Sequence, residues 1–353
     1  MNRHLPAAAR ALVAARRALL SVVLGNRPLT ALVGARHRTP RDGRTLDPQL
    51  AALMTLEELD PDADLSRHDP AGARLTLAAQ AASVDGPGRT GVITEDHTAD
   101  GPRGPIPLRL YSPPGVPTPS AALVYFHGGG WVCGSIETHD ALCQRLADDV
   151  RCRVVSVEYR LAPEHRFPAG VEDALAAFRW VVSHAAELGI DASRVAVAGD
   201  SAGGNLAAVV ARKARGDARS PALQVLLYPG LDGTCSQPSH IELRDGFILK
   251  EHVIQWFLGH YLERGERAHP DMAILLEPDI GGVAPALIYT AGFDPLRDEG
   301  RVYAERLRAA GVRARHLELP SLVHGFAQMT GTIAAAERAM AEITADVRRE
   351  LSG

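Results

Sequence analysis

The sequence predicts an α/β fold, with a doubly wound, mostly parallel central sheet flanked by helices and covered by a helical cap. Short apolar runs of strand length alternate with longer amphipathic runs over most of the chain, which is typical of strand–helix–strand crossover units. Residues 231–282 interrupt this alternation with a helical stretch and no clear strand. An insertion between parallel strands projects above their carboxyl ends, where ligands bind, so we expect part of the cap there.

The elements follow one another regularly after a Pro/Gly loop at 86–88. Expected strands are 106–111, 121–126, 153–158, 194–198, 223–228, 286–290 and 313–319. Expected helices of the body are 140–150, 171–186, 205–215, 301–310 and 332–351. Helical patterns also cover 46–82, with a break at 60–62, and 249–264. We therefore expect a basic extension at 1–44, cap helices within 45–90, and an α/β body at 91–353 that carries the cap insertion.

Composition excludes several classes of protein. The 353 residues are 46% apolar and 23% charged, which allows a sizeable core in one large domain or two. A net charge of −4 gives no general basic surface, so we expect no nucleic-acid partner. The four cysteines have neither a C-x-x-C pair nor metal-ligand spacing, so we expect reduced thiols in a cytoplasmic protein and no metal site.

The first 44 residues form a separate compositional unit, with nine arginines and one acidic residue, whereas the rest of the chain has a net charge of −12. Two sets of residues recur here every seven positions: Arg3, Arg10 and Arg17, and Leu5, Leu12 and Leu19. On a helix these two sets lie on nearly opposite faces. Such a helix would rest weakly on an anionic membrane surface, dock on the acidic body, or belong to a disordered arm. The sequence leaves these alternatives open, together with a homodimer. No apolar run reaches the ~18 residues of a membrane span.

The most informative motif is GDSAG at 199–203, between a strand-like run and a helix-like run. This is the form of a nucleophile elbow, a strained turn in which flanking glycines avoid steric clashes. The hydroxyl of Ser201 is expected at the top of the sheet beside a helix N-terminus, whose dipole favours developing negative charge. Because serine needs a base to act as a nucleophile, the motif predicts a histidine and an acid further along the chain.

Segments elsewhere meet this requirement. Among the aspartates between Ser201 and the last histidine, only Asp294 directly follows a predicted strand, where side chains reach a shared site. His324 lies in a loop before the final helix, whereas His316 lies in an alternating strand pattern and is expected on a sheet face. The glycine run at 128–130 also follows a strand. Its backbone N–H groups, with that of Ala202, suit an oxyanion, whereas a phosphate loop would need G-x-G-x-x-G or G-K-[ST].

The order Ser201, Asp294, His324 is that of α/β hydrolases. From about 46 to 351 the chain resembles the bacterial hormone-sensitive-lipase-like (family IV) carboxylesterases. The motifs that carry the resemblance are HGGGW at 127–131, EYRLAPEHRFPA at 158–169, GDSAGGNL at 199–206, DPLRDEG at 294–300 and HGF at 324–326.

The resemblance implies an α/β-hydrolase fold with a helical cap and a serine esterase that needs no metal or cofactor. The substrates it implies are small carboxylic esters with short to medium acyl chains. Ser201 is then the nucleophile, Asp294 the acid and His324 the base of a catalytic triad, while the amides of Gly128, Gly129 and Ala202 form the oxyanion hole. Residues 1–44 lie outside the resemblance.

Two questions stay open at this level. Trp131, Trp256 and Phe257 are candidates for the substrate pocket, although the last two, at helical spacing, also suit a core. The same triad would also serve an amidase or deacetylase. A non-catalytic ligand-binding protein, like the plant gibberellin receptor, is disfavoured because that receptor lacks the catalytic histidine.

Overall fold

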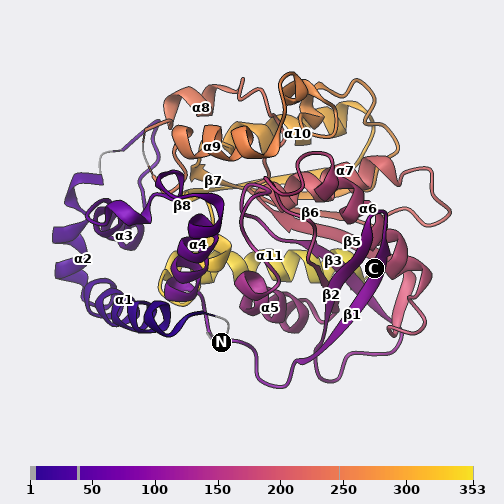
Figure 1. The fold of residues 1–353 in the computed structure, drawn as a ribbon, viewed down its shortest axis with the longest axis horizontal. Coiled ribbons are helices and arrows are strands. Elements are labelled where there is room, and N and C mark those ends of the chain that lie inside the picture. The colour runs from indigo at the N-terminus through magenta and orange to yellow at the C-terminus, as the bar shows by residue number, and fades with distance from the viewer. Residues whose placement is uncertain (1–4, 38–39, 246, 353) are drawn as a thin grey trace.

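The fold is described from a computed structural model, which describes residues 5–37, 40–245 and 247–352. Within these residues the centre of the molecule is an eight-stranded sheet with the order β1-β2-β4-β3-β5-β6-β7-β8 (Figure 1). Strands β4, β3, β5, β6, β7 and β8 are parallel, whereas β1 pairs antiparallel with β2, and β2 antiparallel with β4. The bounds are β1 Ile93–Gly101, β2 Gly104–Ser112, β3 Ser120–Phe126, β4 Arg153–Val157, β5 Ile190–Asp200, β6 Gln224–Leu227, β7 Ala286–Phe293 and β8 Ala314–Val323. The mostly parallel sheet confirms the predicted fold class.

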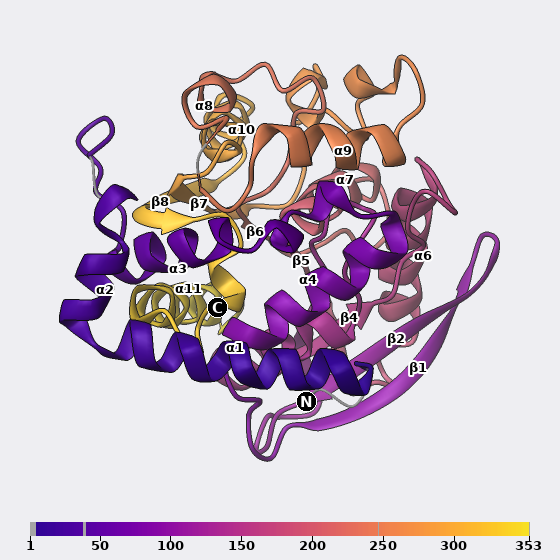
Figure 2. The ribbon, with the colours of Figure 1, turned by 60° about the vertical axis from the view of Figure 1, so that its left-hand side comes forward.

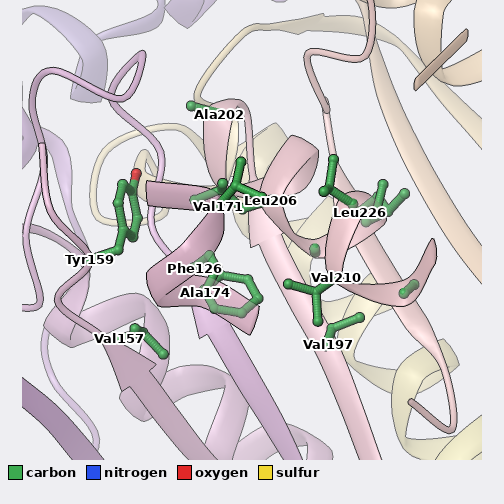
Figure 3. Close-up of a cluster of buried hydrophobic side chains, with 14 of the residues drawn as sticks. Phe126, Val157, Tyr159, Val171, Ala174, Val197, Ala202, Leu206, Val210 and Leu226 are labelled. Carbon is green, nitrogen blue, oxygen red and sulfur yellow. The ribbon is translucent and has the colours of Figure 1, made fainter. Parts of the chain in front are cut away.

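Helices cover both faces of this sheet, which explains why its central strands are apolar throughout. Every residue of β3 and of β7 is buried, as expected for strands covered on both sides. Side chains of β3 alternate between two core clusters, with Phe126 in one and Tyr125 in the other. Figure 3 shows the first cluster, where Phe126 and Val197 lie near Leu206 and Val210.

Each core cluster has its own set of helices. The cluster with Phe126 includes residues of α6 (Ala169–Ser183), α7 (Ala202–Lys213) and α10 (Arg297–Ala309). The cluster with Tyr125 includes residues of α5 (Asp140–Val150) and α11 (Ala334–Ser352). The sheet is therefore wound on both faces, and this arrangement brings the carboxyl ends of β5, β7 and β8 to one edge of the molecule.

Further helices lie at this edge (Figure 2). The N-terminal ones are α1 (Ala7–Gly25), α2 (Arg27–Val33), α3 (Pro48–Glu58) and α4 (Pro70–Val84), and α8 (Pro238–Glu242) and α9 (Glu251–Tyr261) lie between β6 and β7. An aspartate caps α3 and α4, each followed by proline at the first helical position, a strong start signal. Two 3₁₀ turns, Pro61–Ala63 and Leu65–Arg67, occupy the break between α3 and α4.

The sequence missed one strand. The edge strand β1 was not predicted because its sequence, ITEDHTADG, is polar and mostly exposed. The predicted helix 140–150 has the observed bounds of α5, and the other elements differ by a few residues at their ends. Strands β7 and β8 extend past the predicted ends, to Phe293 and Val323. Each strand therefore ends directly before one of the candidate site residues, Asp294 or His324.

Helix α1 docks on α3 and α4, which was one of the three alternatives for the N-terminal extension. Its buried side chains include Leu20 and Leu24, whereas Leu12 and Leu19 are exposed. Its arginines hold it in place: Arg16 pairs with Glu57, and Arg17 donates to the carbonyl oxygens of residues 82 and 85. The two predicted faces are therefore not cleanly divided between the body and the outside: Leu5 is buried and Leu12 and Leu19 are exposed, whereas Arg17 contacts the body and Arg10 is exposed. Arg3 lies outside the described residues.

Candidate active site

Ser201 lies in a tight turn between β5 and α7. Its φ of 52° and ψ of −117° place it in a strained conformation that ordinary residues rarely adopt. The glycines on either side make the turn sterically allowed. A Cβ on Gly199 would lie 2.3 Å from the carbonyl oxygen of Gly203, and a Cβ on Gly203 would lie 1.9 Å from that of Phe126. The sequence therefore builds a nucleophile elbow with the serine at the N-terminus of α7.

His324 contacts both Ser201 and Asp294. Its Nε2 lies 2.9 Å from Oγ of Ser201, and its Nδ1 lies 2.8 Å from Oδ2 of Asp294. Asp294 is fully buried, and its other oxygen accepts the N–H of Leu296 at 2.9 Å. The carboxylate thus requires the proton of the imidazole on Nδ1 and leaves Nε2 as the acceptor for the serine hydroxyl. The structure brings together all three residues that the sequence singled out.

The fold itself positions these groups. Asp294 follows β7 and His324 follows β8, so both occupy the carboxyl edge of the sheet, at the level of Ser201 after β5. The ring of Tyr228 packs against that of His324, with 4.8 Å between the ring centroids. Side chains far apart in sequence therefore converge without long loops.

The glycine loop after β3 requires one correction. The N–H of Gly128 donates to Oδ1 of Asp200 at 2.8 Å, so it is not available to an oxyanion, contrary to the expectation. Among the hydrogen bonds of the described residues, none uses the N–H of Gly129, Gly130 or Ala202 as donor. These three residues line the same cavity as Ser201. Gly130 therefore replaces Gly128 as a candidate donor.

Asp200 anchors this loop. Its Oδ1 also accepts the hydroxyl of Tyr125 at 2.7 Å and lies 3.3 Å from Nε2 of His139. Burial alone would raise the pKa of Asp200, but His139, Tyr125 and the Gly128 amide hold the pKa below its usual range. The sequence pointed only to a hydrogen-bonded turn residue here, because its partners come from distant segments.

His127, at the start of the loop, is a neutral core residue. It is fully buried and its ring stacks on Tyr159, with 4.3 Å between centroids. Burial, together with the neighbouring His139, lowers its pKa to about 3. Its Nδ1–H donates to the carbonyl of Gly128 at 2.9 Å. His127 therefore shapes the loop rather than reacting.

A cavity of about 460 Å³ opens over Ser201 and is lined by the glycine loop, α3, α4 and α9. Trp131 and Phe257 line it, as expected. Trp256 does not line it, and its ring packs against those of Phe257 and His260. The expectation for Trp256 was wrong because two adjacent helical residues point about 100° apart.

The other singled-out residues have structural contacts. His316 lies on β8 and meets the hydroxyl of Thr290 at 2.8 Å. Asp298 pairs with Arg297 at 3.1 Å in the first turn of α10. Glu164 pairs with Arg74 at 2.6 Å, and Glu158 accepts the N–H of residue 136 at 2.7 Å. The part of the chain that the structure describes contains no cluster of metal-ligating side chains, and none of its helices is long and apolar enough to cross a membrane.

Comparisons with known proteins agree with this geometry. The profile of a family with the alpha/beta hydrolase fold matches residues 123–328. The carboxylic ester hydrolase LipN of Mycobacterium tuberculosis is 44% identical over 308 residues, which cover 85% of this chain and 81% of LipN. An ethyl acetate hydrolase of Pseudomonas putida is 36% identical over 324 residues, covering 87% of this chain and all of the relative. The structure of an ester hydrolase from the Lake Arreo metagenome, solved with a bipyridine phosphonate derivative, superimposes with a TM-score of 0.84 at 36% identity, covering 88% of this chain and 100% of the other.

Fold and relatives together define an α/β hydrolase that cleaves carboxylic esters. Within that class, the chain belongs to the hormone-sensitive-lipase-like (family IV) carboxylesterases.

Proposed function

We propose that this carboxylesterase works through Ser201 as nucleophile, His324 as general base and acid, and Asp294 as the group that orients His324. The observation that carries the proposal is the double contact of His324, at 2.9 Å to the serine hydroxyl and 2.8 Å to the buried carboxylate. A base must lie within hydrogen-bond reach of the proton that it removes, and this imidazole does.

The reaction then has two acyl-transfer steps. Oγ of Ser201 bonds to the ester carbonyl carbon while its proton moves to Nε2 of His324. The imidazolium gives that proton to the leaving alkoxide oxygen, so the alcohol departs and an acyl-enzyme remains. A water molecule next bonds to the acyl carbon and loses its proton to His324, and the imidazolium then returns a proton to Oγ as the acid leaves.

We assign the oxyanion hole to the backbone N–H groups of Gly129, Gly130 and Ala202. They line the cavity beside Ser201 and have no acceptor among the described residues. Fixed donors aimed at developing charge in a site with little water typically contribute ~3 kcal/mol each to transition-state stabilisation. The N-terminus of α7 adds a favourable dipole at the same place.

The size and lining of the cavity favour short to medium acyl chains. Its volume of about 460 Å³ lies in the range of small-molecule pockets, roughly 300–1,000 Å³, and apolar side chains such as Leu53, Ile254 and Phe257 line much of it. We expect kcat/KM to be highest for chains between acetate and octanoate, and to fall steeply toward palmitate.

Purified Ser201→Ala protein tests the proposal. The substitution removes one partly buried oxygen atom, so the melting temperature should stay within a few degrees of the parent. Hydrolysis of p-nitrophenyl butyrate should fall at least 10³-fold, since the remaining catalysis comes from the oxyanion hole and binding. A folded Ser201→Ala protein that keeps more than a few per cent of the parent rate would reject the assignment. A p-nitrophenyl ester series from acetate to palmitate checks the expected chain-length preference.

We also propose that the outer face of α1 contacts an anionic membrane surface. This face exposes Leu12, Leu19 and Val22, with exposed fractions of 61%, 51% and 65%. Residues 5–37 contain no acidic side chain, and Arg10 and Arg27 are exposed on α1 and α2. Exposed apolar residues with basic neighbours suit anionic lipids, whereas self-association would bring like charges together.

Vesicle sedimentation separates the membrane from a homodimer. The protein should bind vesicles of phosphatidylcholine with 30% phosphatidylglycerol, and not pure phosphatidylcholine. The variant L12Q/L19Q/V22Q should lose this binding and keep esterase activity. Absence of binding to the anionic vesicles would reject the membrane contact, as would light scattering that shows a dimer dissociated by the same triple substitution.

A further inference from the structure

We propose that Arg74 of α4 is a positioning residue of the oxyanion hole, which aims and polarises the N–H of Gly130 through a hydrogen-bonded chain of two peptide groups. This inference rests on the proposed function, because it takes Gly130 as a donor to the oxyanion that forms at Ser201. Arg74 itself does not line the cavity over Ser201. It therefore acts on the reaction through the glycine loop and not by touching the substrate.

The first peptide group of the chain carries the N–H of Gly130. In a trans peptide such as this one, the C=O and the N–H point in opposite directions, so the carbonyl of Gly129 and the N–H of Gly130 move as one rigid unit. That carbonyl accepts the N–H of Cys133 at 2.8 Å and the N–H of Val132 at 3.2 Å. These contacts fix the direction in which the N–H of Gly130 points.

Arg74 holds the second peptide group of the chain. This group joins Val132 to Cys133, and its N–H is the one that donates to Gly129 at 2.8 Å. Its carbonyl, on Val132, accepts Nε–H of Arg74 at 2.8 Å. The order is thus guanidinium, peptide, peptide and oxyanion, with every donor pointing the same way. Hydrogen bonds in such a chain polarise one another, and a positive charge at its far end favours negative charge on the oxygen beside Gly130.

The guanidinium of Arg74 is fixed by acceptors on both of its terminal nitrogens. Nη1 and Nη2 pair with the two carboxylate oxygens of Glu164 at 2.9 and 2.6 Å, and Nη2 also donates to the carbonyl of Ala162 at 2.9 Å. The N–H of Ala162 in turn donates to the carbonyl of Trp131 at 2.9 Å. Arg74 therefore holds the loop both directly and through the segment 158–169, a sequence motif to which the triad gives no role.

The turn that Arg74 braces has a backbone that most residues avoid. Gly129, Gly130 and Trp131 have φ values of 118°, 61° and 60°. A residue such as Trp131 keeps this conformation only where its surroundings impose it. Asp200 holds the start of the loop, and Arg74 holds the end of the turn. Loss of Arg74 should therefore let the N–H of Gly130 turn away from the oxyanion.

Two matched ketones separate this role from a general effect on the cap. Oγ of Ser201 bonds to the carbonyl carbon of 1,1,1-trifluoroheptan-2-one, its proton moves to Nε2 of His324, and the carbonyl oxygen becomes an oxyanion. Heptan-2-one occupies the same cavity without forming this adduct. The ratio of the two inhibition constants, heptan-2-one over trifluoroketone, therefore measures stabilisation of the oxyanion, and it does not depend on how much of the enzyme is folded.

We expect Arg74→Met to lower this ratio about 10-fold, which is part of the roughly 10²–10³-fold effect of losing an oxyanion donor. The kcat for p-nitrophenyl butyrate should fall by a similar factor, whereas KM and the inhibition constant of heptan-2-one should stay within about threefold. Arg74→Lys keeps the charge but not the planar fork of donors, so its ratio should be intermediate. This second variant tests the inference even if Arg74→Met does not fold.

Arg306 supplies the matched control. It is half-buried like Arg74 and also donates to backbone carbonyls, but to those of residues 274, 275 and 277 in the cap insertion. Arg306→Met should leave the ketone ratio within about twofold of the parent. An unchanged ratio in the Arg74 variants would overturn the inference, and so would an equal fall in Arg306→Met. Equal increases of both inhibition constants would also overturn it, because they would indicate a loosened cavity. Failure of the trifluoroketone to inhibit the parent would contradict the proposed function, and the inference with it.

Discussion

The carboxylate of Asp200 accepts the backbone N–H of Gly128 at 2.8 Å, and this contact ties the nucleophile elbow to the glycine loop. Asp200 immediately precedes Ser201, so the residue that begins the elbow also fixes the loop with the other proposed oxyanion donors. The relative position of Oγ and the amides of Gly129 and Gly130 therefore depends on one buried side chain.

Substitution of Asp200 should reduce kcat more than it changes KM. Asp200→Ala frees the Gly128 amide and removes the acceptor of Tyr125, so the loop is no longer held in the geometry for the transition state. We expect kcat for p-nitrophenyl butyrate to fall about 10²-fold, the effect of losing an oxyanion donor, with KM within threefold. Tyr125→Phe, which removes only one donor to Asp200, should cost less. Equal losses in the two variants, or a loss confined to KM, would contradict the positioning role.

A complex with a covalent phosphonate tests the assignment of the amides. The phosphonyl oxygen that mimics the oxyanion should lie about 3 Å from the nitrogens of Gly129, Gly130 and Ala202. The N–H of Gly128 should still donate to Asp200. If the crystal structure of the complex shows the Gly128 amide turned to the phosphonyl oxygen, the original assignment of Gly128 is restored and the corrected one fails.

His127 should make the protein sensitive to acid. Its pKa in the folded state is about 3, below the value of ~6.5 of an unfolded histidine, so the unfolded state binds more protons between these values. Its contribution to stability is therefore complete above pH 6.5 and is lost as the pH falls toward 3, by up to about 1.4 kcal/mol per pH unit. Urea unfolding at pH 8, 6, 5 and 4 should show a shallower dependence for His127→Asn than for the parent. Parallel curves would mean that His127 is not held neutral.

Neighbouring leucines on α1 should respond differently to truncation. Leu20 is 1% exposed and packs in the core cluster with α3, whereas Leu19 is 51% exposed. Leu20→Ala should reduce the free energy of unfolding by about 2–4 kcal/mol, and Leu19→Ala should change it by less than about 0.5 kcal/mol. Chemical denaturation of both variants measures this difference. Equal effects would show that α1 does not dock through the Leu20 face.

Chain order and strand ends were sufficient to predict that Ser201, Asp294 and His324 lie together, because side chains that follow parallel strands meet at one edge of the sheet. The direction of a single amide was not predictable. Whether Gly128 or Gly130 offers its N–H depends on the partner that Asp200 supplies from a distant strand. Trp256 was misassigned because the sequence does not fix which face of α9 turns toward the cavity. Strand β1 was missed because an exposed edge strand lacks an apolar pattern.

The contact of Arg74 with the carbonyl of Val132 was not visible in the sequence for a similar reason. The two residues are 58 positions apart, and only the docking of α4 on the body brings them together. The docking of α1 likewise depends on Glu57 and on carbonyl oxygens at the end of α4. Local patterns define elements, whereas pairings between elements require the fold.

The most direct test of the triad is stoichiometric inactivation with diethyl p-nitrophenyl phosphate. If His324 activates the hydroxyl of Ser201, each protein molecule should release one p-nitrophenolate, and peptide mass spectrometry should find the diethylphosphoryl group on Ser201. The folded variants Ser201→Ala and His324→Ala should release almost none over the same time. A label on any other residue, or an undiminished burst from Ser201→Ala, would contradict the account.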